Sequence, residues 1–373
     1  MQESSRAFLF AVSSLLLAGA AGCGSRSSLE TTTTGERMGI RDGDAAAQGN
    51  EAGDGAVLQN DHDAGGGPDC ALDPLSCEPH IVLFGGFSFS SNTFLGDTWE
   101  WDGSTWTQRN ASGPSPRAGH AMATLDGKVV LFGGSMTSSL PADTMLEGGT
   151  FGDTWEWDGS AWTERATGPS PGMRSRHAMA TLNGKVVLFG GGVDGQTLAP
   201  PQTWLWDGDT WSLGSSRGPS ARRGHTMTTV GDRVVLFGGA DENGTLFDDV
   251  WTWDGTAWTP VVTYGSAGYL PPARYGHAAA ALGGALWISG GVGSVLLGDL
   301  WSWNFSLWSL ETSGPSLRDA ASMATLGDSV FLFGGDLVDH LSDDSTYRWD
   351  GTAWSHFDQA GPPARAESAM ATQ

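Results

Sequence analysis

Cysteine and basic residues are both scarce in this sequence, and each scarcity excludes something. The 373 residues include 3 cysteines, and none follows Cys77. The rest of the chain therefore has no disulfide to stabilise it and depends on apolar packing, for which its length is ample. Lysine and arginine number 19 against 42 acidic residues, which gives a formal net charge of −23. Without a basic patch to neutralise phosphates, nucleic acid is not expected as a partner.

An apolar segment lies near the N-terminus and ends before Cys23. It is too short and too rich in small residues to predict a membrane span, so we interpret residues 1–22 as a signal peptide. The tetrapeptide that ends at Cys23 resembles a bacterial lipoprotein box, which implies lipidation of this cysteine. Gly24 is not the Asp that retains many lipoproteins at the inner membrane, so the resemblance implies an outer-membrane destination. The alternative is ordinary signal cleavage after Ala20, and both alternatives export the protein.

The next segment has the composition of a tether. Between Gly24 and Pro79 the chain has few large apolar residues and carries 11 acidic residues and 3 arginines. Such a segment cannot bury a core, so residues 23–79 are predicted to be a lipidated cysteine followed by a disordered acidic linker. Cys70 and Cys77 are candidates for a small disulfide loop in an oxidising compartment, and we expect no zinc site there. Contact with the membrane is expected through the N-terminal lipid alone.

A tryptophan pattern recurs six times after the linker and accounts for 17 of the 18 tryptophans. Its first copy reads Trp99-Glu-Trp101-Asp-Gly-Ser-Thr-Trp106. Each copy follows an apolar run that ends in a Gly-Gly pair, and the first glycines of these pairs lie 48, 57, 48, 52 and 44 residues apart. Self-similarity at this period indicates a tandem array of structural repeats.

Short turns indicate how the strands are arranged inside each repeat. Asp126-Gly127 and Asn183-Gly184 each separate two β-type runs, and such dipeptides are strong hairpin signals because both residues tolerate positive φ. Asp102-Gly103 lies in the same way between a third and a fourth run. Each repeat is therefore predicted to be an antiparallel meander of four strands.

Repeats of about 50 residues with four strands each are typical of kelch propellers. Through the Gly-Gly pair, the aromatic third strand, the Trp of the fourth strand and the Pro-x-x-Arg-like entry, the chain resembles the kelch and galactose-oxidase central-domain family. The resemblance implies an all-β, six-bladed propeller over residues 80–373. The first repeat begins at His80 without an innermost strand, and residues 369–372 form such a strand without a repeat. We predict that this C-terminal strand pairs with residues 81–84 and closes the first blade.

The long, variable loops are expected on one face of the ring, where binding normally resides. Phe89, Tyr264 and Tyr269 lie in these loops, and they either stack against a ligand or fold back over the blades. An Arg-x-x-His element opens four repeats on the same face. Its candidate binding residues are Arg117, His120, Arg174, His177, Arg222, His225, Arg274 and His277. One hypothesis is a ring of imidazoles that binds a metal or an anion, and the other, which we favour because the element recurs, is hydrogen bonding between blades.

Enzyme families with related propellers are not matched by the residues here. The copper site of galactose oxidase needs a cysteine, which the predicted propeller lacks, and Asp102-Gly-Ser-Thr-Trp106 is one residue too short for a sialidase box. Leu332 stands where nitrile-specifier proteins need an acidic residue. The acidic loop at positions 336–344 does not have EF-hand spacing and is interpreted as solvated. No catalytic residue, metal or cofactor is predicted.

The sequence thus predicts a monomeric, exported, membrane-tethered module that binds a protein or a polysaccharide on its long-loop face. A carbohydrate-active enzyme of the sialic-acid mutarotase type is the alternative, and a structural envelope protein is a further one. A buried acidic residue beside a paired arginine at the mouth of the channel would favour the enzyme. The fold alone does not decide between these functions.

Overall fold

The computed structural model describes residues 78–136, 149–165, 168–193, 197–338 and 340–373. The chain divides into two units, Met1–Asp63 and Ala64–Gln373, and every described residue belongs to the second. The predicted signal peptide, the predicted lipidation site Cys23, the candidate disulfide cysteines Cys70 and Cys77, and Asp339 of the acidic loop lie outside the described residues. Across the described ranges, no helix is both long and apolar enough to cross a membrane.

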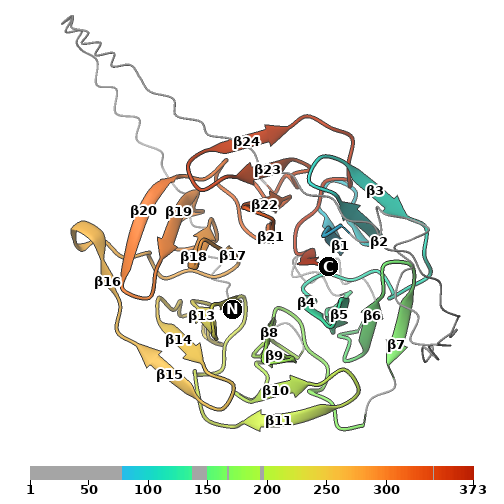
Figure 1. The fold of residues 1–373 in the computed structure, drawn as a ribbon, viewed down its shortest axis with the longest axis horizontal. Coiled ribbons are helices and arrows are strands. Elements are labelled where there is room, and N and C mark those ends of the chain that lie inside the picture. The colour runs from blue at the N-terminus through green and yellow to red at the C-terminus, as the bar shows by residue number, and fades with distance from the viewer. Residues whose placement is uncertain (1–77, 137–148, 166–167, 194–196, 339) are drawn as a thin grey trace, which may run out of the picture. The chain divides into compact units, whose positions relative to one another are not determined.

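The second unit is a ring of six antiparallel blades (Figure 1), as the resemblance implied. In each blade the strands run from the axis to the rim. Blade 1 contains β25 (Ala369–Thr372), β1 (Ile81–Ser88), β2 (Thr93–Trp101) and β3 (Trp106–Arg109). Blade 2 contains β4 (Ala121–Leu125), β5 (Lys128–Phe132), β6 (Thr154–Trp157) and β7 (Trp162–Arg165). Blade 3 contains β8 (Ala178–Leu182), β9 (Lys185–Phe189), β10 (Thr203–Trp206) and β11 (Trp211–Ser215).

The remaining three blades follow in chain order. Blade 4 contains β12 (Thr226–Val230), β13 (Arg233–Phe237), β14 (Val250–Trp253) and β15 (Trp258–Val261). Blade 5 contains β17 (Ala278–Leu282), β18 (Ala285–Ser289), β19 (Asp299–Trp303) and β20 (Leu307–Ser313). Blade 6 contains β21 (Ser322–Leu326), β22 (Ser329–Phe333), β23 (Thr346–Trp349) and β24 (Trp354–Phe357).

The C-terminal strand closes the ring as predicted. In β25, Thr372 pairs with Ile81 of β1 and Ala369 pairs with Phe84, and the two strands run antiparallel. This pairing supplies the innermost strand that the first repeat lacks, so β1 has no free inner edge.

One blade departs from the predicted four strands. Between blades 4 and 5 the chain forms a short strand, β16 (Tyr264–Gly265), and a 3₁₀ turn, η3 (Ser266–Gly268). Strand β16 runs parallel to β20 and adds a fifth strand to the outer edge of blade 5. No alternating apolar pattern marks this place in the sequence, because the added strand lies at the rim and buries little.

The predicted hairpin turns are confirmed by their backbone angles. Asp126 and Gly127 have φ of 49° and 74°, and Asn183 and Gly184 have φ of 53° and 68°. Left-handed values at both central residues are those of the tight turn that matches the twist of a hairpin. The turn between β2 and β3 is held by Asp102, whose carboxylate accepts hydrogen bonds from the backbone N–H groups of Ser104 and Thr105.

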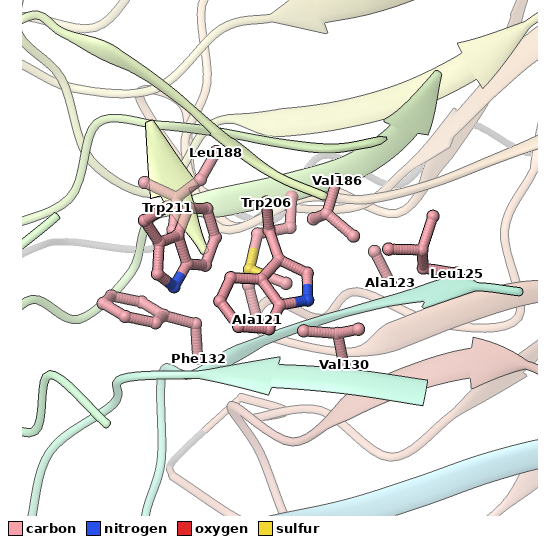
Figure 2. Packing of buried hydrophobic residues seen from close by; sticks show 10 residues of the cluster. Ala121, Ala123, Leu125, Val130, Phe132, Val186, Leu188, Trp206 and Trp211 are labelled. Atoms are coloured by element: carbon pink, nitrogen blue, oxygen red, sulfur yellow. The ribbon is translucent and has the colours of Figure 1, made fainter. Parts of the chain in front are cut away.

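The apolar core lies between blades (Figure 2). Small residues of β4, such as Ala121 and Ala123, pack against the large indoles of Trp206 and Trp211 from the next blade. The two indoles lie tilted with ring centroids 5.5 Å apart. The small residues near the axis and the large ones toward the rim give each blade a wedge shape, which lets six of them close into a ring.

Candidate functional site

The repeated arginines lie buried inside their own blades. Arg117 donates two hydrogen bonds to the carboxylate of Asp153, at 2.7 and 2.9 Å, and a third to the carbonyl of Gly133 at 2.9 Å. Equivalent ion pairs to a carboxylate in the same blade are made by Arg222, Arg274, Arg318 and Arg365. Arg174 has carbonyl partners instead, and burial lowers its pKa to about 10. With their guanidinium groups engaged, these side chains stabilise the blade to which each belongs.

The four repeated histidines lie in the seams between blades. The ring of His120 packs edge-on against Phe84 of the preceding blade, with centroids 5.5 Å apart, and His177, His225 and His277 pack in the same way. His277 also shares a hydrogen bond of 2.8 Å with Thr226 of the preceding blade. Burial, and then the neighbouring arginine, lowers the pKa of His120 to about 3. A buried, neutral imidazole is a poor anion site, and all four rings also line the cavity described below.

The three candidate aromatic residues separate into two places. Tyr264 and Tyr269 lie on the outer edge of blade 5, where they are 64% and 68% exposed. Phe89 follows β1 and lies beside the axis, where it stacks on His340 with ring centroids 5.7 Å apart. Only Phe89 of these three reaches the cavity described next.

Around the axis runs a closed ring of backbone hydrogen bonds, one residue per blade. Each member immediately precedes the histidine position of its blade, and its N–H donates to the carbonyl of the member in the preceding blade at 2.6 to 3.0 Å. All six have φ between 53° and 66°. The members are Gly119, Arg176, Gly224, Gly276, Ala320 and Glu367. A left-handed residue is needed at each position, and in half of the blades it is not glycine.

A cavity of about 420 Å³ opens above this ring. All six blades contribute to its wall, and the turn after β1 and the loop after β22 rise beside it. We call it the channel-mouth pocket. Its lining includes the four repeated histidines, His120, His177, His225 and His277. The other lining side chains that carry charge or aromatic rings are Phe89, Arg176, Tyr275, Asp319, Asp336, His340 and Glu367. The pocket thus lies on the long-loop face and combines the repeated histidines with residues that break the repeat.

The side chains of Arg176 and Glu367 meet across Gly119. Arg176 Nη2 and Nε lie 2.5 and 3.1 Å from Glu367 Oε1. A Cβ on Gly119 would lie 3.3 Å from Arg176 Cγ and 3.4 Å from Glu367 Oε2, so the glycine makes room for the pair. Interaction with Glu367 raises the pKa of Arg176, and the guanidinium stays charged. Glu367 is thus a partly buried acidic residue beside a paired arginine at the mouth of the channel.

Asp319 is the most perturbed carboxyl group of the pocket. Burial raises its pKa to about 7, and the negative charges of Asp336 and Glu367 act in the same direction. The charges of Arg176 and His340 oppose that shift. At neutral pH Asp319 is therefore divided between its protonated and ionised forms, which is the state that proton transfer requires.

Asp336 and His340 form the rim of the pocket beside Asp319. Asp319 and Asp336 face each other as a backbone bridge. His340 Nδ1 lies 2.9 Å from Asp336 Oδ2, while Asp336 Oδ1 is buried without a hydrogen-bond partner among the described residues. Within the described ranges, no group of three or more His, Cys, Asp or Glu residues is placed to hold a metal ion.

Sequence reasoning placed the site on this face but did not select Arg176, Tyr275, Asp319 or Glu367. The available signal was the departure from the repeat: three blades have Gly immediately before the histidine position, whereas Arg176, Ala320 and Glu367 stand there in the others. Residues that depart from the repeat in this way are candidates for a site that one part of the ring carries. The sequence-based prediction selected the recurring arginines and histidines instead.

Comparisons with known proteins match the repeat region. The family model of the KLHDC2/KLHL20/DRC7 Kelch-repeats domain matches residues 155–335. The dynein alpha chain of the flagellar outer arm from Chlamydomonas reinhardtii is 31% identical over 189 residues, which cover 47% of this chain and 4% of the dynein chain. The Rho GTPase-activating protein gacHH from Dictyostelium discoideum is 31% identical over 131 residues, 34% of this chain and 8% of that protein. This chain thus matches less than a tenth of either relative's length.

A solved structure shares the fold. The structure titled "Structure of YjhT" superposes with a TM-score of 0.58 at 16% sequence identity, covering 70% of this chain and 91% of that one. At this identity the likeness concerns the architecture of the blades. The side chains of the channel-mouth pocket must therefore be interpreted from their own geometry.

Proposed function

The chain is a kelch-repeat β-propeller, a fold that supports a binding module, and from this we propose that it binds a carbohydrate in the channel-mouth pocket. One observation carries the proposal. Arg176 and Glu367 occupy left-handed positions that glycine fills in three other blades, and their side chains meet at the floor of the pocket. A side chain in this conformation costs about 1–2 kcal/mol relative to the right-handed one, and such strain gathers at functional sites.

The chemistry of the pocket suits a hydroxylated ligand. Carboxylate and guanidinium groups make strong hydrogen bonds to hydroxyl groups, and Arg176, Glu367 and Asp319 present both kinds from different blades. Phe89 and Tyr275 add aromatic surface for the apolar face of a sugar ring. A volume of about 420 Å³ lies within the range of small-ligand pockets, so it fits one or two sugar units or the end of a chain.

Equilibrium binding tests this proposal. We expect a glycan array to identify a ligand for the full chain. Calorimetric titration of that ligand is expected to show that Glu367→Gln binds it at least about tenfold more weakly than the wild-type chain, because a charged hydrogen-bond acceptor is lost. Asp248→Asn is the matched control, since Asp248 is an exposed carboxylate of a loop on the same face that does not line the pocket. Affinity unchanged in Glu367→Gln, with a ligand bound, would place the site elsewhere.

Asp319 favours a second candidate function, that of a carbohydrate-active enzyme such as a mutarotase. Its carboxyl group, with a pKa raised to about 7, is able to donate and accept a proton beside the Arg176–Glu367 pair. Polarimetry of a freshly dissolved single anomer would measure such an activity. Interconversion accelerated by the chain and slowed at least about 100-fold in Asp319→Asn supports the enzyme. If the interconversion rate with the protein equals the rate in buffer alone, the enzyme is contradicted and the binding module is the function that stays.

The location of the protein is part of the proposal. We infer that the chain is exported and tethered through lipidated Cys23, with residues 24–79 as the linker, because the segment before Cys23 has the pattern of a lipoprotein signal. A palmitate analogue is expected to label the wild-type chain and not Cys23→Ala. Label that persists in the variant would contradict the anchor.

A further inference from the structure

The channel-mouth pocket holds more negative than positive charge. Asp319, Asp336 and Glu367 line it, and Arg176 is the guanidinium that lines it with them. Glu367 takes up that guanidinium, with contacts of 2.5 and 3.1 Å to the same carboxylate oxygen. The two remaining carboxyl groups, on Asp319 and Asp336, lie across a backbone bridge from each other and repel.

The carboxylate of Asp336 indicates where a positively charged group of a ligand would bind. Asp336 is 8% exposed, lines the pocket, and has one buried carboxylate oxygen, Oδ1, that no described residue hydrogen-bonds. Its other oxygen is engaged by His340. An ionised carboxylate oxygen that is buried without a donor is costly, and a ligand that donates to it removes this cost.

The titration of Asp319 agrees with a deficit of positive charge. Its pKa is raised to about 7 by burial and by the nearby carboxylates. The groups that face it electrostatically are Asp336, Glu367, Arg176, His340 and Tyr275. A cation beside Asp319 would stabilise the ionised form, so binding of a cation near neutral pH is coupled to release of a proton.

We propose that the channel-mouth pocket selects sugars that carry a free, positively charged amino group, with the ammonium between Asp319 and Asp336. This inference rests on the proposed carbohydrate function and names its substrate class. An ammonium supplies three donors, which fit the carboxylate groups of two residues that face each other across a backbone bridge. The rings of Phe89 and Tyr275 border the same space and attract a cation through their faces. A metal ion is a poorer occupant, because the described residues offer no metal-binding set of three acidic or histidine side chains.

Matched ligands test the charge directly. Calorimetric titration of the full chain at pH 6.5 compares glucosamine with glucose and N-acetylglucosamine, which lack the ammonium. We expect the affinity for glucosamine to be at least about tenfold higher than that for either neutral sugar, because a charge-assisted hydrogen bond is added. Repeating the titration in buffers of different ionisation enthalpy is expected to show net release of protons with the wild-type chain.

Two variants and a control complete the experiment. Asp319→Asn and Asp336→Asn are each expected to remove most of the preference for glucosamine, and Asp319→Asn to abolish the proton release that Asp319 supplies. Asp248→Asn changes the net charge of the chain equally and should keep both. Neutral sugars that bind as tightly as glucosamine, or a preference that survives in Asp319→Asn, overturn the inference while leaving the carbohydrate function in place. Failure of all three sugars to bind overturns the inference, and the carbohydrate function is then decided by the glycan array.

Discussion

Replacing Arg176 and Glu367 with glycine is predicted to stabilise the propeller while abolishing ligand binding. Both residues hold φ near 55° in the ring of backbone hydrogen bonds, where Gly119, Gly224 and Gly276 have the same conformation. A side chain in the left-handed region costs about 1–2 kcal/mol. Glycine recovers that amount but loses about 0.4–1 kcal/mol through the greater entropy of the unfolded chain. The backbone gain is therefore about 0.5–1 kcal/mol at each position.

The ion pair between the two side chains offsets part of this gain. Their side chains are 27% and 26% exposed, so their attraction is screened and contributes at most about 1 kcal/mol. Arg176→Gly/Glu367→Gly removes both partners together and leaves no unpaired charge, and we expect a net stabilisation of about 0.5–1 kcal/mol. Arg176→Gly alone should be less stable than the double variant, because it leaves Glu367 facing Asp319 and Asp336 without a cation.

Urea unfolding of the full chain measures these differences, with calorimetric titration alongside. Ala320→Gly is the matched control, since Ala320 has φ of 53° and no charged side chain, and it should stabilise by about 0.5–1 kcal/mol without changing binding. Gly119→Ala should destabilise by about 1 kcal/mol or more, because its φ is 64° and the new Cβ meets Arg176. A double variant destabilised by more than about 1 kcal/mol would refute the reasoning, since the pair would then be part of what holds the ring together.

Three further predictions concern the ring itself. Arg365→Ala is expected to cost about 3–5 kcal/mol in urea unfolding, because Arg365 is buried and Asp97 in the same blade loses its bidentate partner; a cost below 1 kcal/mol would contradict that role. Trp162→Phe is expected to lower the free energy of unfolding by about 1 kcal/mol more than Trp308→Phe. The Trp162 indole donates a hydrogen bond to Thr98 of the preceding blade, whereas Trp308 faces Val250 at the matching position of blade 4. Equal losses in the two variants would refute this. The pKa of His120 falls from 6.5 in the unfolded chain to about 3 in the folded one, so its contribution to stability is complete above pH 6.5 and is lost as the pH falls toward 3. Near pH 5 its slope is about 1.4 kcal/mol per pH unit, and the unfolding free energy of His120→Ser should depend on pH less steeply by that amount.

The repeat made the architecture predictable from sequence. Gly-Gly pairs and tryptophans at a period of about 50 residues indicate blades, and the orphan strand at residues 369–372 indicates how the ring closes. These features are readable because local turn chemistry and burial act in the same way in every blade. The short strand β16 was not predicted, since a rim strand of two residues leaves no periodic apolar pattern.

The site was harder to predict because a ring brings together residues that no local pattern connects. Arg176 and Glu367 are 191 positions apart in the chain, and only closure of the first blade places them in contact. The recurring Arg and His residues were visible in the sequence; the structure places the arginines inside blades and the histidines in the seams, where they also line the pocket. In a symmetric fold, recurrence reports what every blade needs, whereas the exceptions indicate what one site does.

The most direct measurement of the central claim is the thermal midpoint of the full chain against a panel of amino and neutral sugars. A ligand that binds the native state raises the midpoint by mass action. The account predicts a saturable rise with an amino sugar that is reduced in Glu367→Gln and retained in Tyr264→Ala, whose side chain lies on the outer edge of blade 5. A rise that is retained in Glu367→Gln and lost in Tyr264→Ala would contradict it and move the binding site from the axis to the rim.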